Sequence, residues 1–323
     1  LRLTFIYKIM KFKKPNFWDY KKPNFFAYLL IPLTFLIIII RFFLEKEKIK
    51  TDKIKTVCVG NIYVGGTGKT PLSIKLNKIL NNLDFKTAFV KKKYQDQLDE
   101  QKILLSHGKL FCKKDRVDAL KEAINEKIDV AIFDDGLQDR KLNYDISFVC
   151  FNVESWIGNG LCIPSGPLRE NIKSLKKYDA IFLNGLSDND EEITIIENII
   201  KNIKPNLEIF KSQYVALNIE KLDIKQNYLA FSGIGNPKTF LKTLKQNNFK
   251  IIKSINFPDH YNYSNRDIEK IKNIAENINA KIITTEKDYN RLNKLSAENI
   301  ECLNVDLKIL NEEKLINFLN KKL

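Results

Sequence analysis

One segment in the first quarter of the chain limits the possible folds more than any other. Residues 57–71 read Val-Cys-Val-Gly-Asn-Ile-Tyr-Val-Gly-Gly-Thr-Gly-Lys-Thr-Pro, so a β-branched run enters a glycine cluster that ends in Gly-Lys-Thr. Apolar residues follow at helical spacing, at Leu72, Leu76, Ile79 and Leu80. A strand, a glycine-rich turn and a helix in this order are the setting of a phosphate-binding loop (P-loop). We predict that the loop binds a nucleotide through Gly65, Gly66, Thr67, Gly68, Lys69 and Thr70.

The expected chemistry of the loop follows from its residue types. Glycine tolerates positive φ and carries no Cβ, so backbone N–H groups here can curl around phosphate oxygens. The N-terminus of the following helix adds unpaired donors and a partial positive charge. Lys69 is expected to reach the β- and γ-phosphates, and the Thr70 hydroxyl to bind Mg²⁺. The strict motif has glycine where this chain has Tyr63, so a glycine-rich turn without a ligand is the alternative.

From residue 55 onward, short apolar runs alternate with amphipathic stretches. Helices are expected over 115–126 and 190–203, and strands at 55–60, 86–91, 109–113, 129–134, 146–151 and 179–184. This alternation predicts an α/β fold of the P-loop NTPase type, in which helices cover both faces of a parallel sheet. In such sheets ligands bind at the carboxyl ends of the strands.

A second, smaller α/β unit is expected after a break in the pattern around Pro205. Its expected elements are strands at 227–232, 280–285 and 300–305 and a last helix near 311–322. Asn236-Pro237 and Ser264-x-x-Asp267 are helix-start signals within it. We therefore predict an N-terminal segment (1–44), a P-loop domain (45–225) and a C-terminal α/β domain (226–323) that contributes to the site.

The composition narrows the class of protein. The chain has 323 residues, a hydrophobic content of 44% and a net charge of +15. It can therefore form a real core, and it attracts polyanions such as nucleotide phosphates, anionic lipid headgroups or nucleic acid. Its five cysteines are scattered without a C-x-x-C pair, which favours reduced thiols in the cytosol over zinc sites or disulfides. The presence of only two histidines excludes a His-rich metal site.

The N-terminal segment has the composition of a membrane-associated helix. Residues 1–22 are basic and aromatic, and residues 23–40 form an uncharged apolar run that contains Pro32 and ends before Arg41. The run is at the lower limit of length for crossing a hydrocarbon core of about 30 Å. We expect a helix that spans the bilayer or lies in one leaflet, with a buried core helix as the alternative. Basic residues on both flanks suit an anionic cytoplasmic leaflet.

A second motif lies at residues 129–138, where a predicted buried strand ends in Asp134 and Asp135. An acidic residue at a strand end opposite a P-loop is the Walker-B arrangement, which holds hydrated Mg²⁺. We predict that Asp134 and Asp135 join Thr70 in a metal site. An Asp-Gly turn without a metal is the alternative.

Two loops carry further candidate residues. The segment 158–170 is rich in glycine and proline and ends in Arg169 and Glu170. Arg169 could stabilise charge on a transferred phosphoryl group and Glu170 could orient water or a metal, whereas a solvated ion pair is the alternative. His260 lies in a Phe-Pro-Asp-His loop and is a candidate general base or the partner of one. A structural or merely exposed histidine is the alternative there.

Six motifs occur together and in order, at 59–71, 134–138, 158–170, 233–237, 257–260 and 285–288. This set resembles the tetraacyldisaccharide 4′-kinase family of lipid A biosynthesis. The resemblance runs from the apolar N-terminus to about residue 290. It also accounts for Tyr63, because the loop of that family itself lacks glycine at this position.

The resemblance implies an ATP-dependent lipid kinase. The family phosphorylates the 4′-hydroxyl of a tetraacylated glucosamine disaccharide 1-phosphate and so gives lipid IVA. It acts at the cytoplasmic face of the inner membrane of Gram-negative bacteria, with ATP and Mg²⁺ as cofactors. The implied partners are ATP, the acylated disaccharide and membrane lipids, with no nucleic acid and no required protein partner.

The resemblance also implies roles for single residues. Asp99 is the implied catalytic base, His260 its partner and Lys69 a catalytic phosphate ligand, while Gln138 joins Asp134 and Asp135 in the metal site. Contacts with substrate or phosphate are implied for Lys92, Tyr94, Asn159, Arg169 and Glu170.

The chain departs from the family pattern at three places. Lys92-Lys93-Tyr94 replaces Arg-Gly-Tyr, Leu98 replaces a glycine and Asp139 replaces a histidine. Lys92 keeps the positive charge of the arginine but loses its bidentate fork. These changes bear on phosphate clamping more than on the reaction itself.

Other classes of protein share parts of the pattern. A guanine-binding P-loop protein would carry a motif similar to Thr285-Glu-Lys-Asp288, but Lys287 is one position late. Among membrane-associated P-loop ATPases and GTPases, the deviant-Walker ATPases that position partners need a signature lysine where this chain has Val64. A non-enzymatic membrane adaptor is disfavoured by the intact Lys69 and Asp134.

Overall fold

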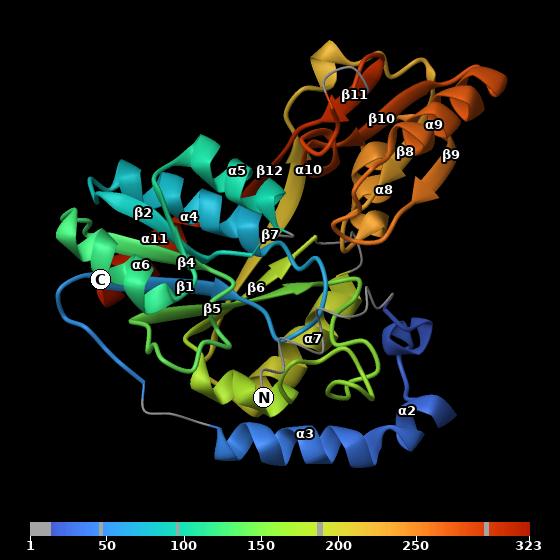
Figure 1. Ribbon diagram of the computed structural model, residues 1–323. Helices are drawn as coiled ribbons and strands as arrows, with labels where there is room; N and C mark the ends of the chain where they lie inside the picture. The colour runs from blue at the N-terminus through green and yellow to red at the C-terminus, as the bar shows by residue number, and fades with distance from the viewer. Residues whose placement is uncertain (1–13, 45–47, 95–96, 186–189, 294–296) are drawn as a thin grey trace. The chain divides into compact units, whose positions relative to one another are not determined.

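The computed structural model describes residues 14–44, 48–94, 97–185, 190–293 and 297–323 (Figure 1). These residues fall into two compact units. The smaller unit holds the N-terminal segment together with Ile62–Val64 and Ser155–Ile172, and the larger unit holds the rest of the described chain.

An eight-stranded sheet forms the centre of the larger unit. Its strands run in the spatial order β12 (Val305–Ile309), β7 (Glu208–Ala216), β6 (Ala180–Asn184), β5 (Ile146–Asn152), β1 (Lys55–Gly60), β4 (Val130–Asp134), β2 (Thr87–Lys92) and β3 (Leu110–Lys113). Neighbouring strands pair in parallel, except that β12 pairs antiparallel to β7. The predicted α/β fold with a mainly parallel sheet is therefore confirmed.

Helices cover both faces of this sheet. α4 (Lys69–Asn82) and α5 (Leu98–His107) lead the chain toward β3, whereas α6 (Arg116–Asn125) and α7 (Asp190–Ile203) lead it back toward β7. Because parallel crossovers are right-handed, these opposite directions put the two pairs of helices on opposite faces. Figure 1 shows α4 and α7 on opposite sides of the sheet. Strands covered in this way are buried on both faces, which explains their continuous apolar runs.

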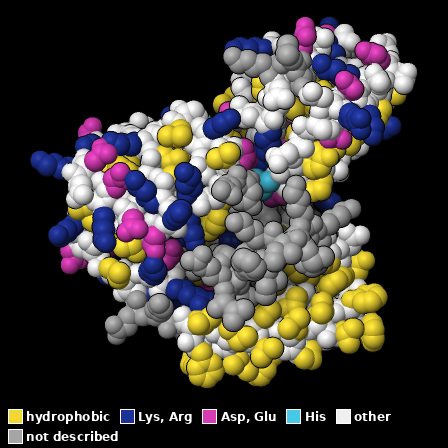
Figure 2. All heavy atoms as spheres, viewed as in Figure 1, with side chains coloured by type: hydrophobic (Ala, Val, Ile, Leu, Met, Phe, Trp, Pro, Cys, Tyr) yellow, Lys and Arg dark blue, Asp and Glu magenta, His cyan; other side chains and the backbone are white. Residues whose placement is uncertain are grey.

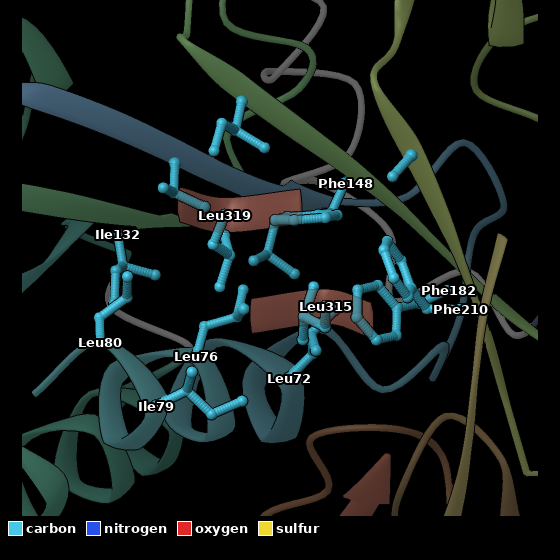
Figure 3. Close-up of a cluster of buried hydrophobic side chains, with 14 of the residues drawn as sticks. Leu72, Leu76, Ile79, Leu80, Ile132, Phe148, Phe182, Phe210, Leu315 and Leu319 are labelled. Atoms are coloured by element: carbon cyan, nitrogen blue, oxygen red, sulfur yellow. The ribbon is translucent and has the colours of Figure 1, made fainter. Parts of the chain in front are cut away.

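The main core lies on the α4 face of the sheet (Figure 3). Leucines of α4 and of α11 (Glu312–Lys322) pack there with aromatic rings from the strands, and the cluster includes Leu72, Leu76, Leu80, Leu315, Leu319, Phe148, Phe182 and Phe210. The rings of Phe182 and Phe210 stack with their centroids 5.2 Å apart. Close packing of α4 against the strands holds its first turn, which carries Lys69 and Thr70, beside the strand ends.

A separate four-stranded parallel sheet follows in the chain. Its spatial order is β11 (Ile300–Leu303), β10 (Lys281–Thr285), β8 (Asn227–Ser232) and β9 (Lys250–Asn256), and its helices are α8 (Pro237–Gln246), α9 (Asn265–Asn277) and α10 (Glu286–Tyr289). The predicted helix starts are confirmed. Asn236 caps α8, which begins at Pro237, and Ser264 forms a capping box with Asp267 at the start of α9.

The C-terminal third differs from the sequence-based expectation in two places. Residues 208–216, where the pattern was expected to break, form β7. Buried Phe210 and Ser212 alternate there with partly exposed neighbours, so β7 lacks the apolar run of the central strands. α11, which was expected with the second sheet, packs in the core of the first sheet, and β12, for which no separate strand was predicted, pairs with β7 there. The apolar face of a helix predicts that the helix packs against something, but it does not predict which sheet the helix packs against.

The smaller unit contains the apolar N-terminal segment, of which residues 1–13 lie outside the described residues. The uncharged run is divided between α2 (Phe25–Leu29) and α3 (Ile31–Phe43), because Pro32 cannot donate the hydrogen bond that one continuous helix needs. None of the helices in the described ranges has the length and apolarity needed to cross a bilayer. Phe35 (63% exposed) and Phe43 (78%) are typical of many exposed apolar side chains on α2 and α3, which contradicts burial in a core (Figure 2).

Three short 3₁₀ helices complete the described secondary structure. They are η1 (Asn16–Asp19) before α2, η2 (Ile172–Lys177) before β6 and η3 (Ile219–Lys221) before β8.

Candidate active site

The P-loop connects β1 to α4 in the larger unit. β1 is buried and ends at Gly60, and α4 begins at Lys69. Gly68, at the helix N-cap, adopts the left-handed conformation with φ of +84°. A Cβ on Gly68 would lie 2.5 Å from Nδ2 of Asn184 and 2.6 Å from the hydroxyl of Tyr214. Glycine meets both the conformational and the spatial requirement at this position.

Side-chain amides hold the P-loop in shape. Nδ2 of Asn61 donates to the carbonyl oxygen of Gly65 (3.3 Å) and to the hydroxyl of Thr67 (3.0 Å). Nδ2 of Asn184 donates to the carbonyl oxygen of Thr67 at 2.6 Å. Nε2 of Gln138 donates to the carbonyl oxygen of Asn61 at 2.8 Å, so the amide nitrogen of this predicted metal-site residue supports the loop. These bonds fix the shape of the loop before a nucleotide binds, which lowers the cost of ordering it.

A turn after β8 approaches the same loop. A Cβ on Gly235 would lie 2.4 Å from the backbone nitrogen of Gly66, and a Cβ on Gly66 would lie 3.2 Å from the carbonyl carbon of Gly235. The two backbones therefore pack without room for a side chain on Gly235. The Gly233–Pro237 motif, which the sequence identifies only as a turn, has this close approach as its physical reason.

Oxygen atoms suited to a divalent cation gather at the end of β4. The Thr70 hydroxyl lies 3.2 Å from Oδ2 of the fully buried Asp134, and the Ser73 hydroxyl lies 3.3 Å from its Oδ1. Asp135 follows with φ of 59°, and its Oδ1 is 3.9 Å from Nζ of Lys69. In the described part of the chain, no three His, Cys, Asp or Glu side chains gather as a metal site. Mg²⁺ bound with a nucleotide needs only one or two carboxylates, because phosphates and water supply its other ligands, so Thr70 and Asp134 fit this ion.

Lys91 is a site residue that the sequence reading missed. The register of β2 with β4 puts Val90 beside Phe133, so Lys91 follows next to Asp134 at the strand ends. Nζ of Lys91 lies 2.6 Å from Oδ2 of Asp134 and 2.8 Å from Oε2 of Glu100. Burial lowers the pKa of Lys91, but the two carboxylates outweigh burial and raise the pKa above its usual range, so the ammonium is charged. A lysine within a strand that is buried on both faces is the signal that could have identified it.

Asp99 and Glu100 lie in the first turn of α5, and they face side chains from the segments that follow β9 and β10 of the second sheet. Nη2 of Arg291 donates to Oδ2 of Asp99 at 2.6 Å, and Nδ1 of His260 lies 3.4 Å from Oδ1 of Asp99. Nζ of Lys287 lies 3.0 Å from Oε1 of Glu100 and 3.8 Å from Oδ2 of Asp99. The structure thus brings the predicted pair Asp99 and His260 together. Sequence reasoning missed Arg291 as a partner and considered Lys287 only as part of a guanine-type motif.

These partners decide the charge of Asp99. Burial raises the pKa of its carboxyl, but the His260 hydrogen bond and the charges of Lys287 and Arg291 outweigh burial and hold the pKa well below its usual range. The pKa of Glu100 is lowered in the same way: burial opposes the shift, whereas Lys287, Lys91 and His260 produce it. Asp99 is therefore ionised at neutral pH and can accept a proton.

We expect this arrangement to make part of the stability pH-dependent. Asp99 has a lower pKa in the folded chain than in the unfolded chain, where its pKa is about 3.9. The stabilisation is therefore fully present above that value and is lost as the pH falls toward the folded pKa. Thermal unfolding of wild type and Asp99→Asn between pH 6 and pH 2.5 tests this expectation. The gap in melting temperature should narrow on acidification, and a constant gap would contradict it.

The remaining predicted residues fall into two groups. Lys92 and Tyr94 lie in the larger unit, where Nζ of Lys92 is 5.7 Å from the ring centroid of Tyr94. Asn159, Arg169 and Glu170 belong to the smaller unit. The Asn159 amide donates to the carbonyl of Ser165 at 3.0 Å, and the Arg169 N–H donates to the carbonyl of Ile62 at 2.6 Å. Contacts of these five residues with substrate or phosphate stay predictions.

Tyr63 also belongs to the smaller unit. It forms an isolated antiparallel bridge with Leu168, and its hydroxyl donates to Oδ1 of Asp19 at 2.8 Å. Burial, together with the charge of Asp19, raises the pKa of Tyr63. The position at which the strict P-loop motif has glycine is therefore used here for side-chain packing.

A P-loop alone fits any protein that binds or hydrolyses a nucleotide. This site adds an ionised carboxylate, Asp99, held by cationic groups of a second sheet and separate from the carboxylate beside Thr70. A second carboxylate has a use when the phosphate acceptor is a hydroxyl whose proton must be removed. The fold and the site therefore define a P-loop kinase.

Comparisons with known proteins narrow this class. The family model described as LpxK, tetraacyldisaccharide-1-P 4′-kinase, matches residues 26–323. Proteins named tetraacyldisaccharide 4′-kinase are similar along nearly their whole length. The one from Pelagibacter ubique (strain HTCC1062) is 52% identical over 312 residues, 97% of this chain and 98% of the relative. The one from Rickettsia canadensis (strain McKiel) is 37% identical over 338 residues, 98% of each chain.

A solved structure agrees with these relatives. The crystal structure of LpxK from Aquifex aeolicus in complex with ATP has a TM-score of 0.65 and 25% sequence identity, over 91% of this chain and 98% of that one. The chain belongs to the tetraacyldisaccharide-1-P 4′-kinase family. The resemblance carried by the six sequence motifs is thereby confirmed.

Proposed function

We propose that this chain transfers the γ-phosphate of ATP to the 4′-hydroxyl of tetraacyldisaccharide 1-phosphate and so forms lipid IVA in lipid A biosynthesis. The family match over residues 26–323, to relatives named for this kinase, carries the proposal. The complex of Aquifex aeolicus LpxK with ATP supports ATP as the phosphate donor. These matches do not favour the alternative of an ATPase or GTPase that positions partners.

The P-loop binds the triphosphate in this proposal. Backbone N–H groups between Gly65 and Gly68 and the N-terminus of α4 supply donors to the phosphate oxygens. Lys69, the first residue of α4, adds positive charge where negative charge develops during transfer. Thr70, Asp134, Asp135 and Gln138 are the residues that would hold Mg²⁺, which neutralises phosphate charge when bound.

Asp99 accepts the proton of the sugar hydroxyl. A bond forms between the 4′-oxygen and the γ-phosphorus, the bond from that phosphorus to the bridging oxygen breaks, and ADP leaves. A carboxylate of low pKa is a weak base, so the proton moves late, when the attacking hydroxyl has become more acidic. His260 and Arg291 contact different oxygens of the Asp99 carboxylate and so fix its orientation.

Other residues bind the lipid substrate and the membrane in this proposal. Lys92, Tyr94, Asn159, Arg169 and Glu170 contact the disaccharide or the phosphates. The exposed apolar side chains of α2 and α3, with the net charge of +15, hold the enzyme at the cytoplasmic face of the bacterial inner membrane. The acyl chains of the substrate then stay in the bilayer, and neither nucleic acid nor a protein partner is required.

Phosphate transfer to a defined lipid tests the proposed function. Purified protein is incubated with γ-labelled ATP and tetraacyldisaccharide 1-phosphate in mixed micelles, and the lipid fraction is separated. We expect labelled lipid whose formation depends on the acceptor and on Mg²⁺. Folded protein that gives no labelled lipid would rule out the kinase.

Charged substitutions on α3 are expected to release the protein from membranes. Phe35 and Phe43 are exposed, and burial of each phenylalanine in the interface contributes about 1.5–3 kcal/mol. Phe35→Asp/Phe43→Asp should therefore lower partitioning into anionic vesicles by at least about 100-fold, measured by flotation. Ile224→Asp/Ile252→Asp, at exposed apolar positions of the larger unit, serves as the matched control and should bind like wild type. Equal release of both variants would show that α3 is not the anchor.

A further inference from the structure

The ammonium of Lys91 lies between two carboxylates that belong to different parts of the site. Lys91 is 1% exposed, and it contacts Asp134 at the end of β4 and Glu100 in the first turn of α5. A buried cation is stable only when its charge is paired and its hydrogen bonds are made. Both carboxylates are therefore required to hold the ammonium, and the ammonium in turn holds them at a fixed separation.

The contacts continue on both sides of Lys91. On one side, Asp134 accepts hydrogen bonds from Thr70 and Ser73 in the first turns of α4, the helix that starts at the P-loop. On the other side, the second oxygen of Glu100 contacts Lys287, which also lies 3.8 Å from Asp99. A chain of contacts, in which the Lys91 ammonium lies between the Asp134 and Glu100 carboxylates, thus connects the start of α4 with the start of α5.

Glu100 and Asp99 are consecutive residues in the first turn of α5. A helical turn is rigid, so fixing the Glu100 carboxylate also restricts the position of the Asp99 backbone. Reactions of this kind are sensitive to placement, and a displacement of about 1 Å can lower the rate about 100-fold. The contact that sets the position of α5 therefore also sets the position of the proposed base.

We propose that Lys91 is a positioning residue, which ties Glu100 to Asp134 and thereby places Asp99 at the correct distance from the nucleotide phosphates. The role of Asp99 in this inference rests on the proposed function. In this inference Lys91 does not act on the reacting atoms themselves, because its ammonium is buried between the two carboxylates. It acts on the rate through α5.

Two variants test the proposal. Lys91→Gln removes the charge but keeps a hydrogen-bond donor, and Lys75→Met is the matched control. Nζ of Lys75 lies 2.8 Å from Glu312, and its side chain is mostly buried, but neither residue belongs to the proposed site. Hydrogen–deuterium exchange of a peptide covering residues 98–107 reports on α5, equilibrium binding reports the Kd for ATP, and the labelled-lipid assay reports kcat.

Lys91→Gln is expected to speed amide exchange in residues 98–107 at least about fivefold, because α5 loses the contact of its first turn. We expect kcat to fall about 10- to 100-fold while the Kd for ATP changes less than about threefold. Lys75→Met should leave exchange in α5 and kcat at wild-type values. Wild-type exchange in Lys91→Gln would overturn the proposal, and so would faster exchange with unchanged kcat.

A double variant keeps the test decisive if Lys91→Gln does not fold. Lys91→Met/Glu100→Gln removes both charges of one pair, and its kcat should equal that of Glu100→Gln alone, because Lys91 acts through Glu100. A further fall in the double variant would show an independent role and overturn the proposal. Absence of lipid phosphorylation by the wild type would overturn the proposed function alone, since exchange in α5 and ATP binding still test the tie between Lys91 and α5.

Discussion

Asp99→Asn is expected to lower kcat by about 10²- to 10⁴-fold, the range that general bases contribute. Asparagine matches aspartate in size but does not accept the proton of the sugar hydroxyl. The KM for ATP should change less than about threefold, because the described contacts of Asp99 are with His260, Lys287 and Arg291 and include no P-loop residue. Steady-state kinetics with the lipid acceptor and ATP varied separately measures both quantities.

Asp115→Asn provides the matched control for that experiment. Asp115 caps α6 through a hydrogen bond from Val117 N–H, and asparagine makes the same cap. The control should retain wild-type kcat. Asp99→Asn removes a negative charge that pairs with Arg291 and Lys287, so it can lower the stability of the fold. The melting temperature of the variant should therefore be measured, and the kinetics of both proteins should be compared below that temperature. A kcat within fivefold of wild type in folded Asp99→Asn would remove Asp99 from the mechanism.

Gly68→Ala is expected to weaken ATP binding at least 100-fold. A residue other than glycine at φ of +84° costs about 1–2 kcal/mol, and the added Cβ would also overlap Asn184 and Tyr214. Asn184 holds the carbonyl of Thr67, so any shift that relieves the overlap also moves the loop. Isothermal titration with ATP and Mg²⁺ measures the change in Kd.

Gly185→Ala separates backbone strain from overlap in that experiment. Gly185 has φ of +74°, but the nearest atom to its added Cβ would be 3.1 Å away, in the side chain of Asn152. The two variants should lose similar backbone stability, while Gly185→Ala should keep a Kd within about tenfold of wild type. Equal weakening by both variants would show that general destabilisation, and not the shape of the P-loop, explains the effect.

The central fold could be predicted from the sequence because its strands are buried on both faces. β1 lies at the predicted residues, and β4, β5 and β6 lie within one residue of them. β8, in the second sheet, also lies at the predicted residues. Continuous apolar runs mark such strands without reference to their neighbours. β7 was not predicted, because one of its faces is less covered than the other and its sequence therefore mixes apolar and polar residues. The pairing of β12 with β7 was not predictable either, because pairing depends on distant residues.

Some residues of the candidate site could likewise be predicted from the sequence, and others could not. Lys69, Thr70 and Asp134 follow from local motifs, and the structure places them together. The proximity of Asp99 and His260 followed from the family resemblance, since 161 positions separate them and no local pattern connects them. Arg291 was missed because a charged residue gives no sign of its partner until the fold is known, whereas the apolar strand around Lys91 marks that lysine as unusual but does not reveal its partners. The contact of Arg291 with Asp99 depends on how the second sheet folds, and the contact of Lys91 with Asp134 depends on the register of β2 with β4.

The place of β12 and α11 in the first sheet has a consequence for biosynthesis. Both elements are translated after the whole second sheet, yet Leu315 and Leu319 fill the core beneath α4. While the ribosome is still making residues 305–323, the apolar core beneath α4 lacks the side chains of α11. The edge of β7 that pairs with β12 is also free during this time. The part of the chain that carries the P-loop is translated before α11 but needs α11 to complete its core, so until α11 has formed a nascent chain exposes apolar surface to chaperones and proteases.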